Sequence, residues 1–397
     1  MMYIKDFVKE HQEELEQLLL TLARIPAPSG KEEKRAEFCL NWLHAHGAKE
    51  AYVDQAGNVV YLYRKMQERI SGKNEKAVVF DAHMDVVFPD EKELPLYEEN
   101  GKIYCPGVGD DTANLAVLLM TAAYAAKYQP DTGIYDVLFV CSVGEEGLGN
   151  LKGVREIAAL FREQIAAFYS FDLHLDAYTC RAVGSLRYRI SVETKGGHSY
   201  GDFGNTNANV VLAELIHDLY EINVPNRGRT TYNVGMISGG TSVNTIAQQA
   251  EMLYEIRSDD YEDLMEMKDR FEEVLSEYPL AGRKSERKNK WSEDVNVLVE
   301  EIGERPCEKD VDAEKRKWLF AQTEKIFEQV TGRIPHPIPC STNCNLPLSL
   351  GIPSICVGMC DGAGAHTREE YVVKESLIKG MEAALRLLEE VNIIYQM

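Results

Sequence analysis

The sequence predicts an α/β protein: a main domain with a mainly parallel sheet, interrupted by an inserted α+β domain. Short apolar, β-rich runs alternate with helical stretches in the first and last parts of the chain, as in parallel α/β folds. Between them the pattern changes to alternating strands with two long helices, which predicts a separate unit. At 397 residues the chain exceeds the ~250–300 residues at which single cores stop growing. We place the main domain at residues 1–181 and 307–397 and the insertion at 182–306.

The elements of the main domain follow from apolar periodicity. Residues 4–25 have helical spacing that stops at a Pro and Gly turn, so we expect an amphipathic helix there and a second one at 31–46. Strands are expected at 58–63, 77–81, 135–141, 167–171 and 353–357. Further helices are expected at 114–127, 151–162, 312–330 and 374–391.

The inserted domain has a different pattern. Alternating apolar and polar residues predict strands at 186–194, 231–237, 248–257 and 295–303. Helical spacing predicts two long helices, at 206–222 and 260–277. We therefore expect a small sheet with helices packed on it.

Composition excludes several functional classes. The N-terminal segment lacks the apolar core of a secretory signal, and no apolar run reaches the ~18 residues of a membrane span. Nine cysteines without a disulfide-like framework suit a reducing compartment, so we expect a cytoplasmic protein. A formal net charge of −21 argues against nucleic acid or an anionic membrane as partner.

Polar residues follow the predicted parallel strands where each strand ends. Because ligands bind beyond the carboxyl ends of such strands, we expect these side chains to meet at one edge of the sheet. They are His83, Asp85, Glu145, Glu146, Asp172 and, further from its strand, His366.

These residue types suggest a metal-assisted hydrolase, although each motif alone has a simpler explanation. Asp85 can orient the ring of His83, but such pairs are usually ordinary hydrogen-bonded side chains. In the pair Glu145 and Glu146, one carboxylate can bind a metal while its neighbour holds the metal's water molecule. In isolation, a solvated acidic pair is the more common explanation. The pair Asp110 and Asp111, after a Gly-x-Gly turn, could equally cap a helix N-terminus.

Together these motifs form an ordered set that covers nearly the whole chain. The set comprises His-x-Asp at 83–85, Gly-x-Gly-Asp-Asp at 107–111, Gly-Glu-Glu-Gly at 144–147, Asp172, and Gly-x-Gly-Ala-His-Thr ending after His366. It resembles the di-zinc exopeptidase and amidohydrolase family that contains tripeptide aminopeptidase, dipeptidases, carnosinases, aminoacylase and carboxypeptidase G. The likeness extends to Gly-Gly-His198, to Asn244 and to Arg257.

The resemblance implies a role for each residue. His83 and Asp172 would bind one metal, His366 and Glu146 the other, and Asp110, rather than Asp111, would bridge them. Asp85 would orient a ligand and Glu145 would be the general base. The insertion would be a lid and dimerisation domain, in which His198 reaches an active site across a homodimer to stabilise the oxyanion. Asn244 and Arg257 would contact substrate, although Arg257 suits a structural salt bridge equally well.

The resemblance also guides the expected reaction. Asp172, where deacylases often have glutamate, favours a dipeptidase, tripeptidase or aminopeptidase acting on short peptides. The alternatives are an N-acyl-amino-acid or carbamoyl amidohydrolase or carboxypeptidase with the same site, and a metal-binding interaction protein without activity. The expected cofactors are two divalent ions, zinc first, with cobalt or manganese possible. Thr112, Asn114 and Asn343 depart from the family's pattern, which leaves substrate choice and the geometry of a helix start open.

Overall fold

The computed structural model describes residues 2–63, 76–280 and 294–394, which form two compact units. Unit 1 consists of Met1–Ala182 and Glu308–Met397, and unit 2 is the intervening segment Val183–Cys307. The boundaries fall at 182 and 307, one residue beyond those placed from the sequence. Each unit has a sheet and an apolar core of its own.

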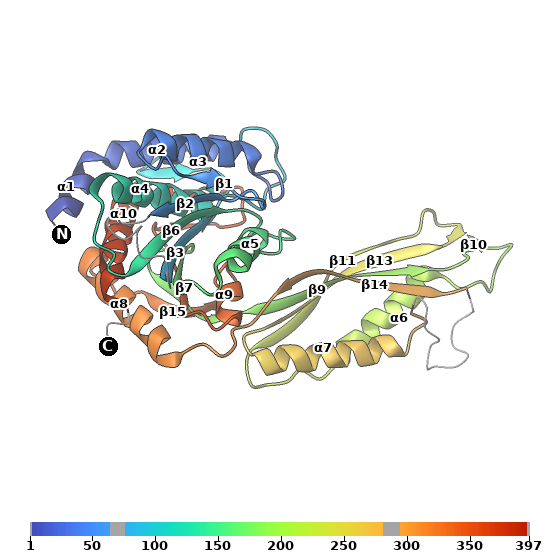
Figure 1. Cartoon of the computed structure of the whole chain (residues 1–397). Coiled ribbons are helices and arrows are strands. Elements are labelled where there is room, and N and C mark those ends of the chain that lie inside the picture. Colours follow the sequence, from blue (N-terminus) through green and yellow to red (C-terminus); the bar gives the residue numbers. More distant parts are fainter. Residues whose placement is uncertain (1, 64–75, 281–293, 395–397) are drawn as a thin grey trace. The chain divides into compact units, whose positions relative to one another are not determined.

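Unit 1 is built on an eight-stranded sheet with the order β1-β2-β6-β3-β7-β16-β8-β15 (Figure 1). The neighbouring strands β6, β3, β7 and β16 are mutually parallel, which confirms the predicted mainly parallel sheet. The pair β8 and β15 is also parallel, whereas β1 and β2, β2 and β6, and β16 and β8 pair antiparallel. The strands are β1 (Tyr52–Val53), β2 (Val59–Tyr63), β3 (Lys76–His83), β6 (Tyr135–Ser142), β7 (Ile165–Phe171), β8 (Ala177–Ala182), β15 (His336–Cys340) and β16 (Ser354–Val357).

Different helices cover the two faces of this sheet, because successive side chains of a strand point to opposite faces. In β3, Val78 and Phe80 belong to one core and Val79 to the other. The first core packs against α1 (Met2–Glu10), α2 (Gln12–Arg24), α3 (Glu33–Ala45), α4 (Asn114–Tyr128), α8 (Ala313–Thr331) and α10 (Lys374–Glu389). The second packs against α5 (Lys152–Phe161) and α9 (Asn345–Ser349).

The prediction of one helix over 4–25 is wrong, because the chain forms two helices that separate at His11. The His11 backbone has φ −113° and ψ 16°, outside the helical region. Its ring stacks on that of Phe7 with 4.0 Å between the ring centroids, and its Nδ1 lies 2.8 Å from the Phe7 carbonyl oxygen. Apolar periodicity does not detect this local contact.

The strands β8 and β15, which end the sheet on one side, were not predicted. β15 contains Pro337 and Pro339, and proline is usual only in edge strands because it has no N–H to donate. The strand occupies the sheet edge beside β8, so its prolines are compatible with the pairing.

A small antiparallel sheet links the segments around the strand ends of unit 1. Its order is β17-β18-β5-β4, formed by β17 (Gly362–Ala363), β18 (Tyr371–Val373), β5 (Lys102–Tyr104) and β4 (Tyr97–Glu99). Tyr371 pairs with Tyr104, so the segment after His366 lies beside the strand that precedes η1 (Val108–Ala113). A short helix, η2 (Glu390–Ile393), follows α10.

Unit 2 is an α+β unit, in agreement with the predicted fold class. Its antiparallel sheet has the order β11-β13-β9-β14 and carries α6 and α7 on one face (Figure 1). The elements are β9 (Gly184–Glu193), α6 (Ala208–Tyr220), β11 (Thr230–Gly239), β13 (Gln249–Ser258), α7 (Tyr261–Ser276) and β14 (Asn296–Arg305), with β10 (Gly197–His198) and β12 (Thr245–Ile246) forming a separate ribbon. Across the described parts of both units, none of the helices has the length and apolar character needed to cross a bilayer.

Candidate metal centre

The predicted site residues of unit 1 gather beyond the carboxyl ends of the four parallel strands. His83 is the last residue of β3, and Asp172 directly follows β7. Glu145 and Glu146 follow the neighbouring strand β6, and His366 comes from the segment between β17 and β18. Parallel strands align their carboxyl ends, which explains why residues so far apart in sequence meet here.

The carboxylate of Asp110 lies between the two histidines. Its Oδ1 is 3.1 Å from Nε2 of His83, and its Oδ2 is 3.1 Å from Nε2 of His366. The same Nε2 atom of His366 lies 3.1 Å from Oε1 of Glu146. Each oxygen of Asp110 therefore faces a different imidazole.

Among the described residues, the potential ligands form three overlapping groups, two of which share Asp110. Within each group, one donor atom per residue lies within 4.8 Å of the others. The groups are His83, Asp110 and Asp172; Asp110, Glu146 and His366; and His83, Glu145 and Glu146. Ligand atoms in a tetrahedral site with bonds of ~2.1 Å are separated by about 3.4 Å, so small adjustments would bring these groups to coordination geometry.

The electrostatics of the cluster favour a bound cation. Burial, helped by the charge on Asp110, raises the pKa of Asp172 to about 8, and burial raises the pKa of Glu146 to about 7. Burial also acts against ionisation of Asp110, but hydrogen bonds from His366 and His83 outweigh it and hold its pKa below the usual range. The contacts with Asp110 and Glu146 raise the pKa of His366 to about 10. Divalent cations would replace these protons, so the donor set fits metal.

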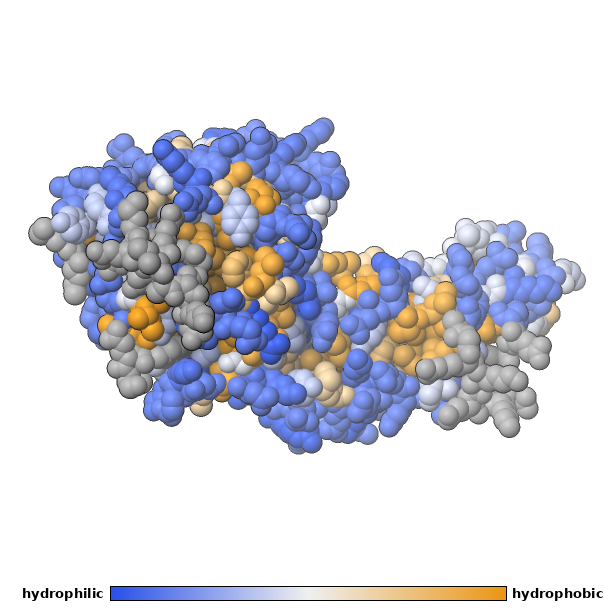
Figure 2. Space-filling model, in the orientation of Figure 1, coloured by the Kyte–Doolittle hydropathy of each residue, from blue (hydrophilic) through white to orange (hydrophobic). Residues whose placement is uncertain are grey.

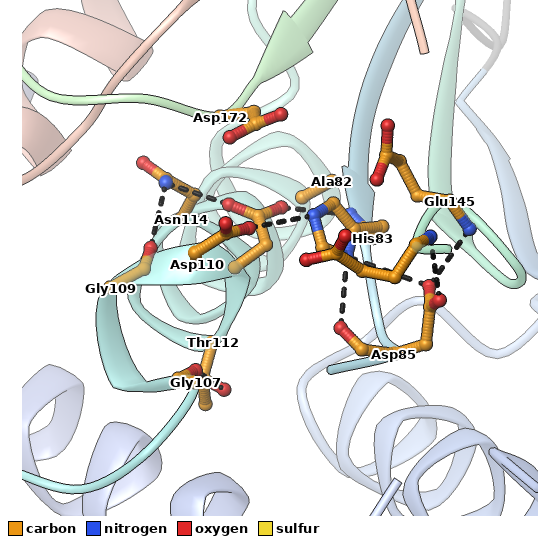
Figure 3. Close-up of polar contacts among 12 residues, drawn as sticks. Ala82, His83, Asp85, Gly107, Gly109, Asp110, Thr112, Asn114, Glu145 and Asp172 are labelled. Atoms are coloured by element: carbon orange, nitrogen blue, oxygen red, sulfur yellow. Dashed lines mark hydrogen bonds and ion pairs between the residues drawn. The ribbon is translucent and has the colours of Figure 1, made fainter. Parts of the chain in front are cut away.

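Asp85 holds the loop that carries the two glutamates (Figure 3). Its Oδ1 accepts the backbone N–H of Glu145 at 3.0 Å. Its Oδ2 accepts the backbone N–H of Glu146 at 2.8 Å and the hydroxyl of Ser29 at 2.7 Å. Nδ1 of His83 lies 2.9 Å from the carbonyl oxygen of Asp85 and 3.5 Å from its Oδ1. The nearer partner of the ring is thus the carbonyl, whereas the sequence led us to expect the carboxylate.

Asp111 belongs to none of these donor groups, and its carboxylate is used by other partners. Its Oδ2 accepts the backbone N–H of His83 at 2.8 Å, and its Oδ1 accepts the side-chain amide of Asn114 at 2.7 Å. Burial raises its pKa well above the ordinary value. Asn114 also accepts the N–H of Met359 at 2.6 Å, and Thr112 donates to the Gly107 carbonyl at 2.6 Å (Figure 3). Thr112 and Asn114, which depart from the family's pattern, therefore hold the backbone around the centre.

The structure brings His198 and Asn244 together within unit 2. His198 pairs with Thr245 in the β10–β12 ribbon, and the N–H of Ser199 donates to the carbonyl of Asn244 at 3.0 Å. Nδ1 of the exposed His198 ring accepts the backbone N–H groups of Tyr200 and Gly201, each at 3.2 Å. In the neutral ring the proton is then on Nε2, which can donate to a ligand.

Arg257 lies elsewhere in unit 2. It pairs with Ser185 and Thr231 near the last residues of β13. His198 pairs with β12, which precedes the first residue of β13, Gln249, so the two residues belong to opposite ends of that strand. The Nε of Arg257 donates to Glu255 at 2.8 Å, and Glu255 also accepts from Arg187 at 2.8 Å. This is the salt bridge that the sequence left open as an alternative.

Three buried charged residues support the centre and have no recognisable motif. The guanidinium of Arg35 donates to the carbonyl oxygens of Met84, Leu22 and Ile25 at 2.7–3.1 Å. The carboxylate of Glu32 accepts the N–H of Gly144, in the turn before Glu145, at 3.1 Å. Glu370 accepts N–H groups of the turn around Asp110. The sequence signal for Glu370, a carboxylate four residues after His366, was too weak to select it.

A parallel-sheet unit with overlapping imidazole and carboxylate groups at its strand ends defines a class of metal-dependent hydrolases. The chain belongs to Peptidase family M20/M25/M40, whose profile matches residues 79–390. It is therefore an enzyme, and the resemblance inferred from its motifs is confirmed.

Individual relatives are distant. The uncharacterized protein YqjE of Bacillus subtilis (strain 168) is 24% identical over 335 residues, which are 80% of this chain and 82% of that protein. An N-acetyldiaminopimelate deacetylase of Halalkalibacterium halodurans is 26% identical over 223 residues, 52% of this chain and 58% of that protein. The crystal structure of a tripeptidase from Staphylococcus aureus has a TM-score of 0.69 and 21% identity, covering 96% of this chain and 99% of that chain. Together with the family match, this likeness supports metal-dependent peptide hydrolysis as the general activity.

Proposed function

We propose that the protein is a two-metal hydrolase that cleaves amide bonds of short peptides. His83 and Asp172 would hold one ion, His366 and Glu146 the other, and Asp110 both. The observation that carries this proposal is the orientation of Asp110, whose two oxygens each lie 3.1 Å from a different histidine. Zinc is the first candidate, with cobalt and manganese as alternatives, because all three accept mixed imidazole and carboxylate ligands.

The remaining residues would perform the proton transfers. When bound, the ions would lower the pKa of a water molecule and polarise the amide carbonyl. Glu145, buried beside His83 and Glu146, would take the proton of the water and pass it to the leaving amine. Asp85 would hold Glu145 in place through the backbone N–H that it accepts at 3.0 Å.

Unit 2 would complete the site across a homodimer. The ring of His198, with its proton on Nε2, would donate to the oxyanion, and Asn244 beside it would contact substrate. β11 is an edge strand, with Met236 63% and Ile237 64% exposed, and Figure 2 shows apolar areas on the visible surface of unit 2. These features support pairing with a second copy. Arg257 uses its Nε for Glu255, and its terminal NH₂ groups would have to supply the contact with a substrate carboxylate.

The preferred substrates are dipeptides and tripeptides with a free N-terminus. Asp172 supports this choice, as does the similarity in fold to a tripeptidase. The second candidate is hydrolysis of N-acyl amino acids, which the partial similarity to an N-acetyldiaminopimelate deacetylase favours.

A matched substrate panel tests the proposal. Protein stripped with chelator and then loaded with zinc, cobalt or manganese is assayed with di- and tripeptides and with the N-acetyl derivatives of the same amino acids. We expect peptide hydrolysis that disappears with chelator and returns with metal. Cleavage of the acetylated compounds alone would replace the peptide assignment with the second candidate. Absence of hydrolysis in folded protein that binds two ions would overturn both.

A further inference from the structure

The carboxylate of Glu370 is held by three backbone N–H groups of the turn that carries Asp110. Oε2 accepts the N–H of Gly107, and Oε1 accepts those of Gly109 and Asp110, each at 2.7 Å. The residue is only 2% exposed. Both of its oxygens are therefore used to fix the backbone on either side of Gly109.

The second glycine of the Gly-x-Gly motif leaves room for this contact. A Cβ atom on Gly109 would lie 3.0 Å from Oε1 of Glu370. Gly107 has φ +76°, and a Cβ there would approach Cγ1 of Val86 to 2.4 Å. Successive N–H groups in such turns form a concave site for an anion. Here the anion is a carboxylate of the chain itself.

Glu370 also ends the segment that carries His366. Residues 363–369 are exposed, the side chain of His366 is 57% exposed, and its backbone is in the left-handed region with φ 63°. Glu370 is the first buried residue after this segment, and its carbonyl accepts the N–H of Cys105 at 3.1 Å. The position of His366 thus depends on how the segment is anchored, whereas His83 is held within a central strand.

We propose that Glu370 is a positioning residue that sets the distance between His366 and Asp110 and so controls the second cation site selectively. The inference rests on the proposed two-metal function. The group of His83, Asp110 and Asp172 lies at the ends of sheet strands and the turn before α4. The group of Asp110, Glu146 and His366 needs the exposed segment, which Glu370 joins to the Asp110 turn through its side chain.

The test compares Glu370→Gln with Glu369→Gln, a matched control at the exposed neighbouring position. Glutamine keeps the size of the side chain but turns an NH₂ group towards the backbone donors. Metal binding to the full chain is measured by titration calorimetry with zinc and by the visible absorption of cobalt. In Glu370→Gln we expect the first ion to bind as in the wild type and the second at least ~10-fold more weakly, as for other residues that orient ligands. Glu369→Gln should bind both ions normally.

The outcomes separate this role from a general structural one. Two ions bound with wild-type affinities in Glu370→Gln, or an equal weakening of both, would overturn the proposal. If that variant does not fold by circular dichroism, Glu370→Asp decides: it keeps the charge but is one methylene shorter, and it should again weaken only the second ion. A wild-type chain that binds fewer than two ions would instead contradict the proposed function, whatever the variants do.

Discussion

Replacing Glu145 by glutamine tests the proposed general base most directly. The change removes one charge and keeps the shape of a buried side chain. The backbone N–H of Glu145 still donates to Asp85, so the loop should keep its conformation. Glu145 is absent from both donor groups that contain Asp110, so both ions should remain bound.

The expected loss follows from the role of a base. Positioned general bases contribute about 10²–10⁴-fold to rate, which corresponds to ~2.7–5.4 kcal/mol of transition-state stabilisation. We therefore expect kcat of Glu145→Gln to fall by about that factor, with little change in KM for a short peptide. The assay measures initial rates at saturating substrate together with the metal content of the same sample. Glu163→Gln, at an exposed position, is the control and should keep wild-type activity.

Two results would refute this reasoning. Wild-type kcat in a metal-replete Glu145→Gln protein would remove Glu145 from the chemistry. Loss of an ion in step with activity would show that Glu145 is a ligand, as its group with His83 and Glu146 allows.

Two further predictions concern the dimer and pH. If His198 acts across a homodimer, an equal mixture of inactive Glu145→Gln and His198→Ala proteins should regain about a quarter of wild-type activity. Half of the dimers are then mixed, and each mixed dimer has one complete site out of two. No recovery after proven subunit exchange would contradict this. In the metal-free folded protein, the pKa of Glu146 is raised from 4.5 to about 7 and that of Asp172 from 3.8 to about 8. The folded state therefore holds these protons more tightly than the unfolded state, and the resulting stability, complete below 4.5 and 3.8, is lost as the pH rises through 7 and 8. Metal-free protein should thus melt at a lower temperature at pH 9 than at pH 6, and zinc should stabilise it more at pH 9. Asp172→Asn should reduce the difference in melting temperature between the two pH values. A melting temperature that rises with pH over this range would contradict the prediction.

Much of the fold could be predicted because it depends on local patterns. The expected strand at 135–141 differs from β6 by one residue, and the helix expected at 114–127 differs from α4 by one. The failures involve contacts that apolar periodicity does not encode. β15 contains prolines that argue against a strand, and only its place at the sheet edge makes them acceptable. The break at His11 depends on a ring contact that periodicity cannot show.

The candidate site divides in the same way. Candidate ligands such as His83 and Asp172 could be selected from the sequence because they lie where apolar strands end, and parallel strands bring such ends together. The resemblance selected Asp110 over Asp111, but their different contacts, with Asp110 among the donor groups and Asp111 on the backbone N–H of His83, are visible only in the folded chain. Glu255, the partner of Arg257, lies two residues earlier on the same face of β13, which the sequence allows; only the pairing of β13 with β9 adds Arg187 to the same carboxylate.

The sequence by itself therefore determined the family, the fold class and the candidate ligands, because these depend on residue type and spacing along the chain. Only the tertiary structure identified the residues that hold the candidate ligands in place. Arg35 and Glu370 bind backbone groups rather than side chains, and any segment has backbone groups, so no pattern of residue types reveals such partners. Those contacts exist only after the chain has folded.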